Sequence, residues 1–139
     1  MQELADDYLA AEPAIVAALA PVPGLRKVYV SQDLADMAEN SQITPAAHVI
    51  YFGDRVQDNA QGGVMGHADQ TWLVILAVHQ VRDGNKAGPL IAALLKTLCG
   101  HHGPLGNLTR ANAPKPYFSG GFGYYPLAFN LKFRTKANR

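Results

Sequence analysis

Apolar and polar residues alternate most regularly in the segment FGYYPLAFNLKFRTK, residues 122–136. One set of positions holds large apolar side chains: Leu127, Phe129, Leu131 and Phe133. The positions between them are smaller or polar: Ala128, Asn130, Lys132 and Arg134. Alternation with a period of two is typical of a strand with one face in the core. The pattern therefore predicts a strand near the C-terminal end, with a second face that is wet or turned to a partner.

A second long strand is predicted from about Val64 to Val81. Its first half, VMGHADQT, is mixed and polar, whereas the run from Trp72 to Val78 is apolar at every position. Strands of about 5–6 residues are typical, so this one is unusually long. We expect its polar half to project beyond the sheet as part of a hairpin that spans about residues 54–71.

Two amphipathic helices are predicted. Near the start of the chain, apolar residues recur at helical spacing: Leu4, Tyr8, Ala11, Ile15 and Leu19. Pro13 either kinks this helix or begins a second one, because proline is tolerated only in a first turn. The segment PLIAALLKTLCG has proline near its start and glycine at its end, which are typical helix boundaries. Its wide apolar stripe predicts close packing against other elements.

The remaining pattern predicts strands at about residues 25–31 and 46–56, a brief helix at about 32–39 capped by Ser31, and an edge strand at about 108–111. This order predicts an α+β fold, in which a small, mainly antiparallel sheet has its helices packed on one face. At 139 residues, we expect one domain, 1–139, with a protruding hairpin.

The apolar run from Trp72 to Val78 requires cover on both faces of its strand. Two helices on one side of a sheet leave the other side open, and the simplest cover is another copy of the chain. This predicts self-association. In the alternative, the strand lies between the N-terminal segment on one side and the helix at 89–100 on the other.

Composition excludes several classes of protein. A net charge of +1 lacks the basic excess typical of nucleic-acid-binding domains. The apolar runs fall short of the ~20 residues that span a bilayer, and we expect no signal peptide. The one cysteine, Cys99, excludes an internal disulfide and fits a reducing compartment such as the cytoplasm.

No catalytic or metal site is predicted. The segment CGHH, residues 99–102, lacks a full tetrahedral ligand set unless His48, His67 or His79 converges on it. Cys99 follows a leucine-rich helix and is expected to be a small buried apolar residue. The glycine-rich FSGGFGYY precedes a strand and not a helix, so it is not a phosphate loop. We expect no cofactor, no metal and no enzymatic activity.

Four segments together resemble the tail terminator proteins of tailed bacteriophages, in the group of Mu-like phages and prophages. They are YLAAEPAIVAALAPVPGLRKV, SQITPAAHVIYFGDRV, QTWLVILAVHQV and NAPKPYFSGGFGYYPLAFNLKF. The resemblance covers about residues 8–133. It implies an α/β sandwich whose protomers form a hexameric ring. Such a ring caps the tail tube, ends its polymerisation and joins the tail to the head or neck.

The resemblance also implies the partners: a homo-hexamer, the tail tube protein, a head-completion, neck or connector protein, and DNA that passes through the lumen without specific binding. It implies a place in the virion, at the head-proximal end of the tail, after synthesis in the host bacterial cytoplasm. Two other functions remain open. One is another head–tail joining or tail-completion protein of similar fold. The other is a small cytoplasmic enzyme with a site between subunits.

Three groups of residues are assigned on this basis. The candidates for docking on the tube or lining the lumen are Arg55, Gln57, Asp58, His67, Asp69 and Gln70. The candidates for the subunit interface are Trp72, Val74, Tyr117, Phe118, Tyr124 and Tyr125. Lys132 and Arg134 make a basic end that faces another phage protein, the DNA path or solvent.

Overall fold

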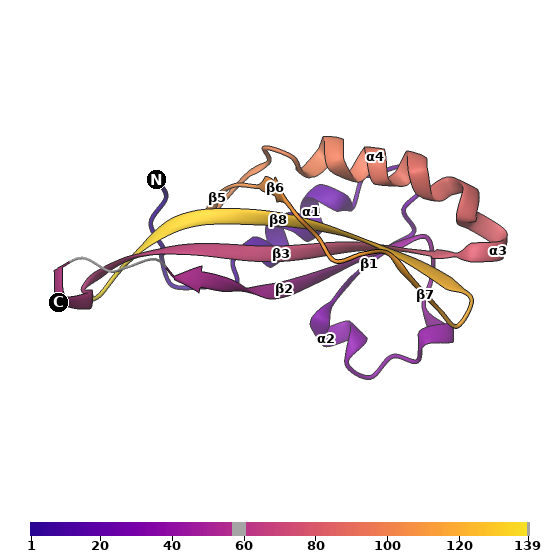
Figure 1. Cartoon of the computed structure of the whole chain (residues 1–139), viewed down its shortest axis with the longest axis horizontal. Helices are drawn as coiled ribbons and strands as arrows, with labels where there is room; N and C mark the ends of the chain where they lie inside the picture. The colour runs from indigo at the N-terminus through magenta and orange to yellow at the C-terminus, as the bar shows by residue number, and fades with distance from the viewer. Residues whose placement is uncertain (57–60, 139) are drawn as a thin grey trace.

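The computed structural model describes residues 1–56 and 61–138. Its main feature is a six-stranded sheet in the order β1-β2-β3-β8-β6, with β7 also paired to β8 (Figure 1). The strands of this sheet are β1 (Lys27–Val30), β2 (Ala46–Val56), β3 (Met65–His79), β6 (Thr109–Ala111), β7 (Tyr117–Ser119) and β8 (Phe122–Lys136). A separate two-residue pair joins β4 (His102–Gly103) to β5 (Gly106–Asn107). Among these strands, every pairing is antiparallel except that of β1 with β2.

The two longest helices, α1 (Ala11–Leu19) and α4 (Ala87–Leu98), pack on the same face of the sheet. In Figure 1, α4 lies above the strands and α1 lies behind them. The shorter helices are α2 (Ser31–Leu34), α3 (Gln80–Asp83) and the 3-10 turns η1 (Glu39–Ser41), η2 (Gln61–Gly63) and η3 (Gly84–Lys86). The predicted α+β class, with a mainly antiparallel sheet, is confirmed. No helix in the described part of the chain is long and apolar enough to cross a membrane.

The two faces of the sheet follow from the alternation along β3. Trp72, Val74 and Leu76 belong to the large core cluster beneath α1 and α4, and we call this side the helical face. The alternate residues Leu73 and Ile75 belong to a second cluster, on what we call the opposite face. Both sets are buried, which explains why the run is apolar at every position.

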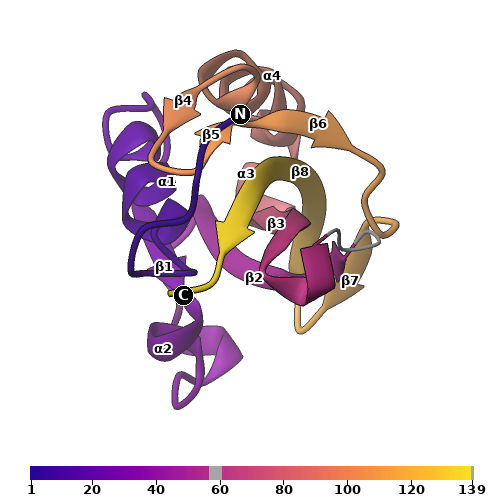
Figure 2. The same ribbon diagram turned by 90° about the vertical axis from the view of Figure 1, so that its left-hand side faces the viewer.

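The opposite face is covered within a single chain, so the expectation that it is left open for another subunit is wrong. Leu73 and Ile75 are only 5% and 6% exposed in the isolated chain. Their cluster is completed by residues of the same sheet: Ala77, Phe122, Tyr124 and Ala128, with Ile50 and Ala111 at its margin. The alternative, in which the N-terminal segment covers one side of this strand and the helix at 89–100 the other, is also wrong. Instead, α1 and α4 share the helical face (Figure 2).

The connection from β1 to β2 contributes to this cover. Because these two strands are parallel, the chain must cross from one end of the sheet to the other, and residues 31–45 make this crossing. The crossing carries α2 and η1 on the side away from α4 (Figure 1). At its start, the carboxylate of Asp33 accepts a hydrogen bond from the backbone N–H of Val30 at 3.0 Å. The predicted brief helix is therefore present, although it ends at Leu34.

The residues before α1 are not helical: Glu3 forms an isolated bridge with Arg134, and residues 8–10 form a turn. The prediction of helix is therefore wrong for residues 4–10 and right for Ala11–Leu19. The backbone N–H of Leu4 donates to the Arg134 carbonyl at 2.8 Å, and that of Arg134 donates to the Gln2 carbonyl. This segment thus pairs with the far end of β8. Pro13 lies in the first turn of α1, where its missing N–H has no intrahelical partner to lose.

The ends of β2, β3 and β8 extend together beyond the helices (Figure 1). At 15 residues each, β3 and β8 are paired along their whole length, from Met65 with Lys136 to His79 with Phe122. The tip of the predicted hairpin, with Gln57 and Asp58, lies outside the described residues. We call the part formed by residues 54–56, 65–71 and 130–136 the extended end.

Candidate assembly surfaces

The extended end has one charged face. Asp69 of β3 is paired with Arg55 of β2 on one side and with Lys132 of β8 on the other. Two residues back along β3, His67 is paired with Arg134. Residues directly opposite one another in a sheet, and residues two apart along a strand, share a face. These five side chains therefore occupy the same side of the sheet, and we call them the charged face.

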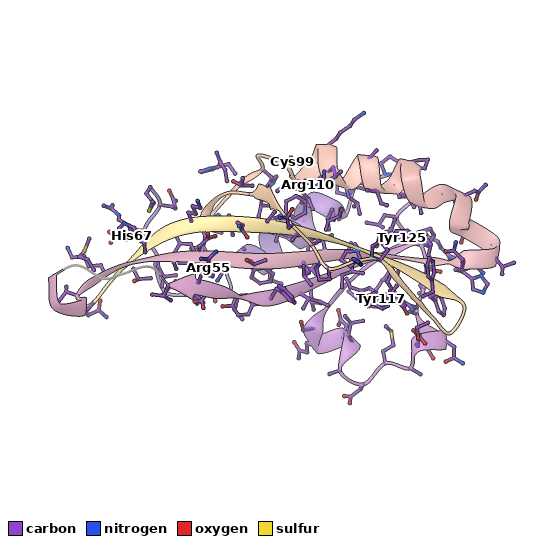
Figure 3. All side chains as sticks on the ribbon, in the orientation of Figure 1. Arg55, His67, Cys99, Arg110, Tyr117 and Tyr125 are labelled. Carbon is purple, nitrogen blue, oxygen red and sulfur yellow. The ribbon has the colours of Figure 1, made fainter. Side chains whose placement is uncertain are left out.

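This charged face is predominantly basic. Arg55, His67 and Lys132 are exposed, and Figure 3 shows Arg55 and His67 on the part of the sheet that projects past the helices. Arg134 forms an ion pair with Glu3 at 3.8 Å. Lys136, opposite Met65, adds a further cation at the same end. Of the predicted hairpin candidates, Arg55, His67 and Asp69 thus share one surface with the predicted basic end.

Asp69 is the one carboxylate among the five side chains of the charged face. Its Oδ1 atom is buried and has no hydrogen-bond partner among residues 1–56 and 61–138, and the same is true of Arg134 Nε. Buried polar atoms in proteins are nearly always satisfied, so unpaired ones are unusual. Both atoms are shielded from solvent, so in this conformation neither is accessible to a partner that approaches the face.

Gln70 does not belong to this surface, and its assignment as a docking residue is wrong. It falls on the helical face, opposite Leu131, and is fully buried. Its Nε2 donates to the Tyr8 carbonyl at 2.8 Å, and its Oε1 accepts from Trp72 Nε1 at 2.7 Å. The N-terminal segment, which lies over this part of the sheet, supplies the burial.

Several predicted interface residues are core residues instead. Trp72 and Val74 have no exposed surface in the isolated chain, so they cannot contact a neighbour in this conformation. Tyr124 is 5% exposed, and Tyr125 packs partly buried against the core of the helical face. The assignment of Trp72, Val74 and Tyr124 to an exposed interface is therefore wrong, whereas that of the partly exposed Tyr125 stays a prediction. The reason is that each has a partner inside the chain that sequence spacing did not reveal.

Tyr117 and Phe118 remain accessible, with exposures of 48% and 65%. They lie in β7, at the other end of the molecule from the charged face (Figure 3). The Tyr117 ring stacks on Tyr124 at 4.9 Å between centroids, and Phe118 meets Tyr125 edge to face. Their role in a subunit interface stays a prediction.

A chain of hydrogen bonds, buried at His48 and exposed at Ser119, ties the crossing segment to the opposite face. His48 Nε2 lies 3.0 Å from Gln42 Oε1, and Gln42 Nε2 donates to the Tyr124 hydroxyl at 2.9 Å. That hydroxyl donates to Glu39 Oε2 at 2.6 Å. Ser119 completes the chain by donating to the other carboxylate oxygen of Glu39 at 3.2 Å. Since Gln42 Oε1 only accepts, His48 must carry its proton on Nε2.

This network is adapted to neutral His48. Burial lowers the pKa of His48 from 6.5 to about 4, because an imidazolium is poorly solvated inside the protein. Burial also raises the pKa of Tyr124, and the nearby Glu39 carboxylate raises it further. The sequence pattern predicts an interface role for Tyr124 and no role for Gln42 or Glu39. Nothing in their spacing marks them, because they meet only through the crossing.

The histidines do not converge on a metal site. His48 is buried on the opposite face, His67 lies at the extended end, and His102 pairs with Asn107 at 2.7 Å beyond α4. No group of three or more His, Cys, Asp or Glu residues within the described ranges could hold a metal ion. Cys99 is exposed at the C-terminal end of α4, so its expected burial is wrong.

The fold has a counterpart in a virion. A chain of the structure titled "Virion of native gene transfer agent (GTA) particle" matches with a TM-score of 0.51 and 16% sequence identity. The match covers 91% of this chain and 88% of that chain. At this level of identity, the likeness concerns the fold alone. A search of curated proteins finds no match.

Sequence comparison identifies the class of protein. The profile of the family described as "Phage tail terminator protein" matches residues 4–139, nearly the whole chain. The chain belongs to this family, and the resemblance found in the sequence is thereby confirmed. It is a structural protein of the bacteriophage tail.

Proposed function

We propose that this chain forms a hexameric ring on the last ring of the tail tube, ends tube polymerisation there, and offers its other side to a head-completion or neck protein. The family match over residues 4–139 is the observation that carries this proposal. In this role the protein acts by assembly and not by catalysis. It occupies the head-proximal end of the tail, and DNA passes through the central opening.

The charged face of the extended end is the proposed contact with the tail tube protein. Its cations, Arg55, Lys132 and Arg134, come from two strands on either side of Asp69. Opposite charges across an interface guide association and fix its register. We therefore expect an acidic patch on the tube surface that receives this face.

A lumenal position for the same face is the weaker alternative. Each DNA phosphate that a cation neutralises adds affinity, and a ring of cations would hold DNA that has to pass. Six copies of three or more cations would multiply that effect. The basic character of the face therefore favours a protein partner over the DNA path.

The proposal is tested by co-sedimentation of the purified chain with assembled tail tubes from the same phage. We expect the chain to pellet with tubes at a ratio set by the number of tube ends and not by tube length. Longer tubes at constant mass offer fewer ends and should therefore bind less. Binding that is proportional to total tube mass, or no binding, would contradict a capping role.

A further inference from the structure

The edge of the sheet at β2 is open along most of its length. β1 is paired only with residues Ala46–Val49, and no strand in the described part of the chain covers that side of residues 50–56. Two large apolar side chains are exposed along this stretch, Phe52 at 57% and Val56 at 66%. Open edges with exposed apolar side chains are prone to pair with another chain, so native proteins normally protect them.

A bulge separates Phe52 from the core. Tyr51 is paired with Trp72 and Gly53 with Thr71, which leaves Phe52 as the extra residue without a cross-strand partner. Gly53 has φ +103°, a conformation that favours glycine. Bulges re-aim a side chain and are common at sheet edges. Phe52 is therefore a fixed apolar projection on the open edge.

The other side of the same sheet has a hollow of about 480 Å³. It lies where β8 has no neighbouring strand: β6 is paired with Ala128–Asn130 and β7 with Phe122–Tyr124. The hollow is lined by Arg110, Ala111, Asn112, Ala113, Pro126, Leu127 and Ala128. The accessible surface of this recess is mainly polar, and its volume lies in the range of ligand sites.

Charge is complementary between the projection and the hollow. Asp54 follows Phe52 on the open edge and is exposed. Arg110 lines the hollow, and Lys115 follows in the exposed segment between β6 and β7. Neither cation forms an ion pair with a residue of the described ranges. Figure 3 shows Arg110 on the side of the sheet where α4 lies, away from the β2 margin.

We infer that Phe52 of one copy enters the hollow beside Arg110 of a second copy, with Asp54 facing Arg110 across the contact. The two surfaces are at opposite edges of one sheet, so the contact is head to tail and each copy uses both. Such a contact makes a ring when its rotation closes. The inference rests on the proposed ring and names the surfaces that build it.

Cysteine cross-linking tests the contact. In a Cys99→Ser background, a Phe52→Cys and Ala113→Cys double variant is assembled on tail tubes and oxidised. A disulfide requires Cα atoms about 4.4–6.8 Å apart, so only a close contact is captured. We expect covalent species from dimer to hexamer and none larger. The matched control, Val81→Cys with Phe118→Cys at the far end, should remain monomeric.

Charge exchange provides a second measurement in case the cysteine pair prevents assembly. Asp54→Arg alone and Arg110→Asp alone should each reduce the fraction of capped tubes at least tenfold, and the double variant should restore it. Asp54 also accepts a hydrogen bond from the Tyr8 hydroxyl, which Asp54→Arg removes. Because Arg110→Asp cannot restore that hydrogen bond, recovery of capping in the double variant reports the contact between copies. Hexameric rings without cross-links and without rescue would overturn this contact but not the ring. The absence of rings would overturn both.

Discussion

Gln70 bridges the Trp72 indole and the Tyr8 carbonyl: its amide oxygen accepts from the indole at 2.7 Å, and its amide nitrogen donates to the carbonyl at 2.8 Å. It is fully buried in a core that is otherwise apolar. This one side chain therefore fixes the N-terminal segment over β3, at the point where the sheet begins to project. The position of the extended end depends on that anchor.

Replacement of Gln70 by Met keeps the approximate shape and removes both hydrogen bonds. The Trp72 N–H and the Tyr8 carbonyl then stay buried without partners, so we expect a loss of about 2–4 kcal/mol in the free energy of unfolding. Urea denaturation measures it. The exposed Gln2→Met is the matched control and should change stability by less than about 0.5 kcal/mol. Equal effects of the two variants would contradict the anchoring role.

Acid should destabilise the fold through His48. Its pKa is 6.5 when exposed and about 4 in the folded chain, so the unfolded state takes up the proton first as the pH falls. Stability is therefore unaffected above pH 6.5 and declines between pH 6.5 and pH 4, by roughly 3 kcal/mol in total.

The His48→Gln variant separates this effect from those of other groups. Between pH 6.5 and pH 4, the variant should lose less stability than the wild type, and the difference should be most of the loss expected from His48. The exposed His102→Gln should leave the decline unchanged. Denaturation midpoints measured at half-unit pH steps provide the comparison, and parallel curves for wild type and His48→Gln would refute the assignment.

Tyr124→Phe should loosen the crossing segment. The change removes the donor to Glu39 and the acceptor for Gln42 but keeps the ring that packs with the opposite-face cluster. We expect a loss of about 1–3 kcal/mol, together with faster amide exchange in residues 39–44. Tyr117→Phe, which retains a stacked and half-exposed ring, serves as the control. Unchanged exchange in Tyr124→Phe would show that the network does not hold the segment.

Reversal of charge on the charged face should weaken the capping of tubes. Lys132→Glu and Arg55→Glu each place a carboxylate beside Asp69, and we expect at least a tenfold loss of tube binding in the co-sedimentation assay. The wild-type interaction should also weaken as salt rises. Lys96→Glu on the exposed side of α4 is the control, with binding unchanged. Equal binding by all three variants would exclude the charged face from the contact.

The strongly periodic elements could be predicted from the sequence. The alternation from Phe122 to Lys136 is β8, and the apolar run with its polar extension is β3. The segment 4–10 was predicted as helix because its apolar spacing continues that of α1. Its pairing with β8, which no local pattern encodes, decided the outcome.

The charged face could be predicted only in part. Lys132 and Arg134 share a face by alternation within one strand, which the sequence shows directly. That Arg55 joins them depends on the bulge at Phe52, since a strand without the extra residue would turn Arg55 to the helical face. The sequence pattern wrongly predicts an exposed Gln70 for a similar reason. The N-terminal segment that buries it lies more than 60 positions away in the chain.

Electron microscopy of the chain mixed with its tail tube protein shows directly whether the chain caps tubes. We expect sixfold rings at one end of the tubes, with the extended ends of the protomers turned to the tube, and shorter tubes as the chain is added in excess. Uncapped tubes of unchanged length, beside a chain that stays separate in solution, would contradict the capping role.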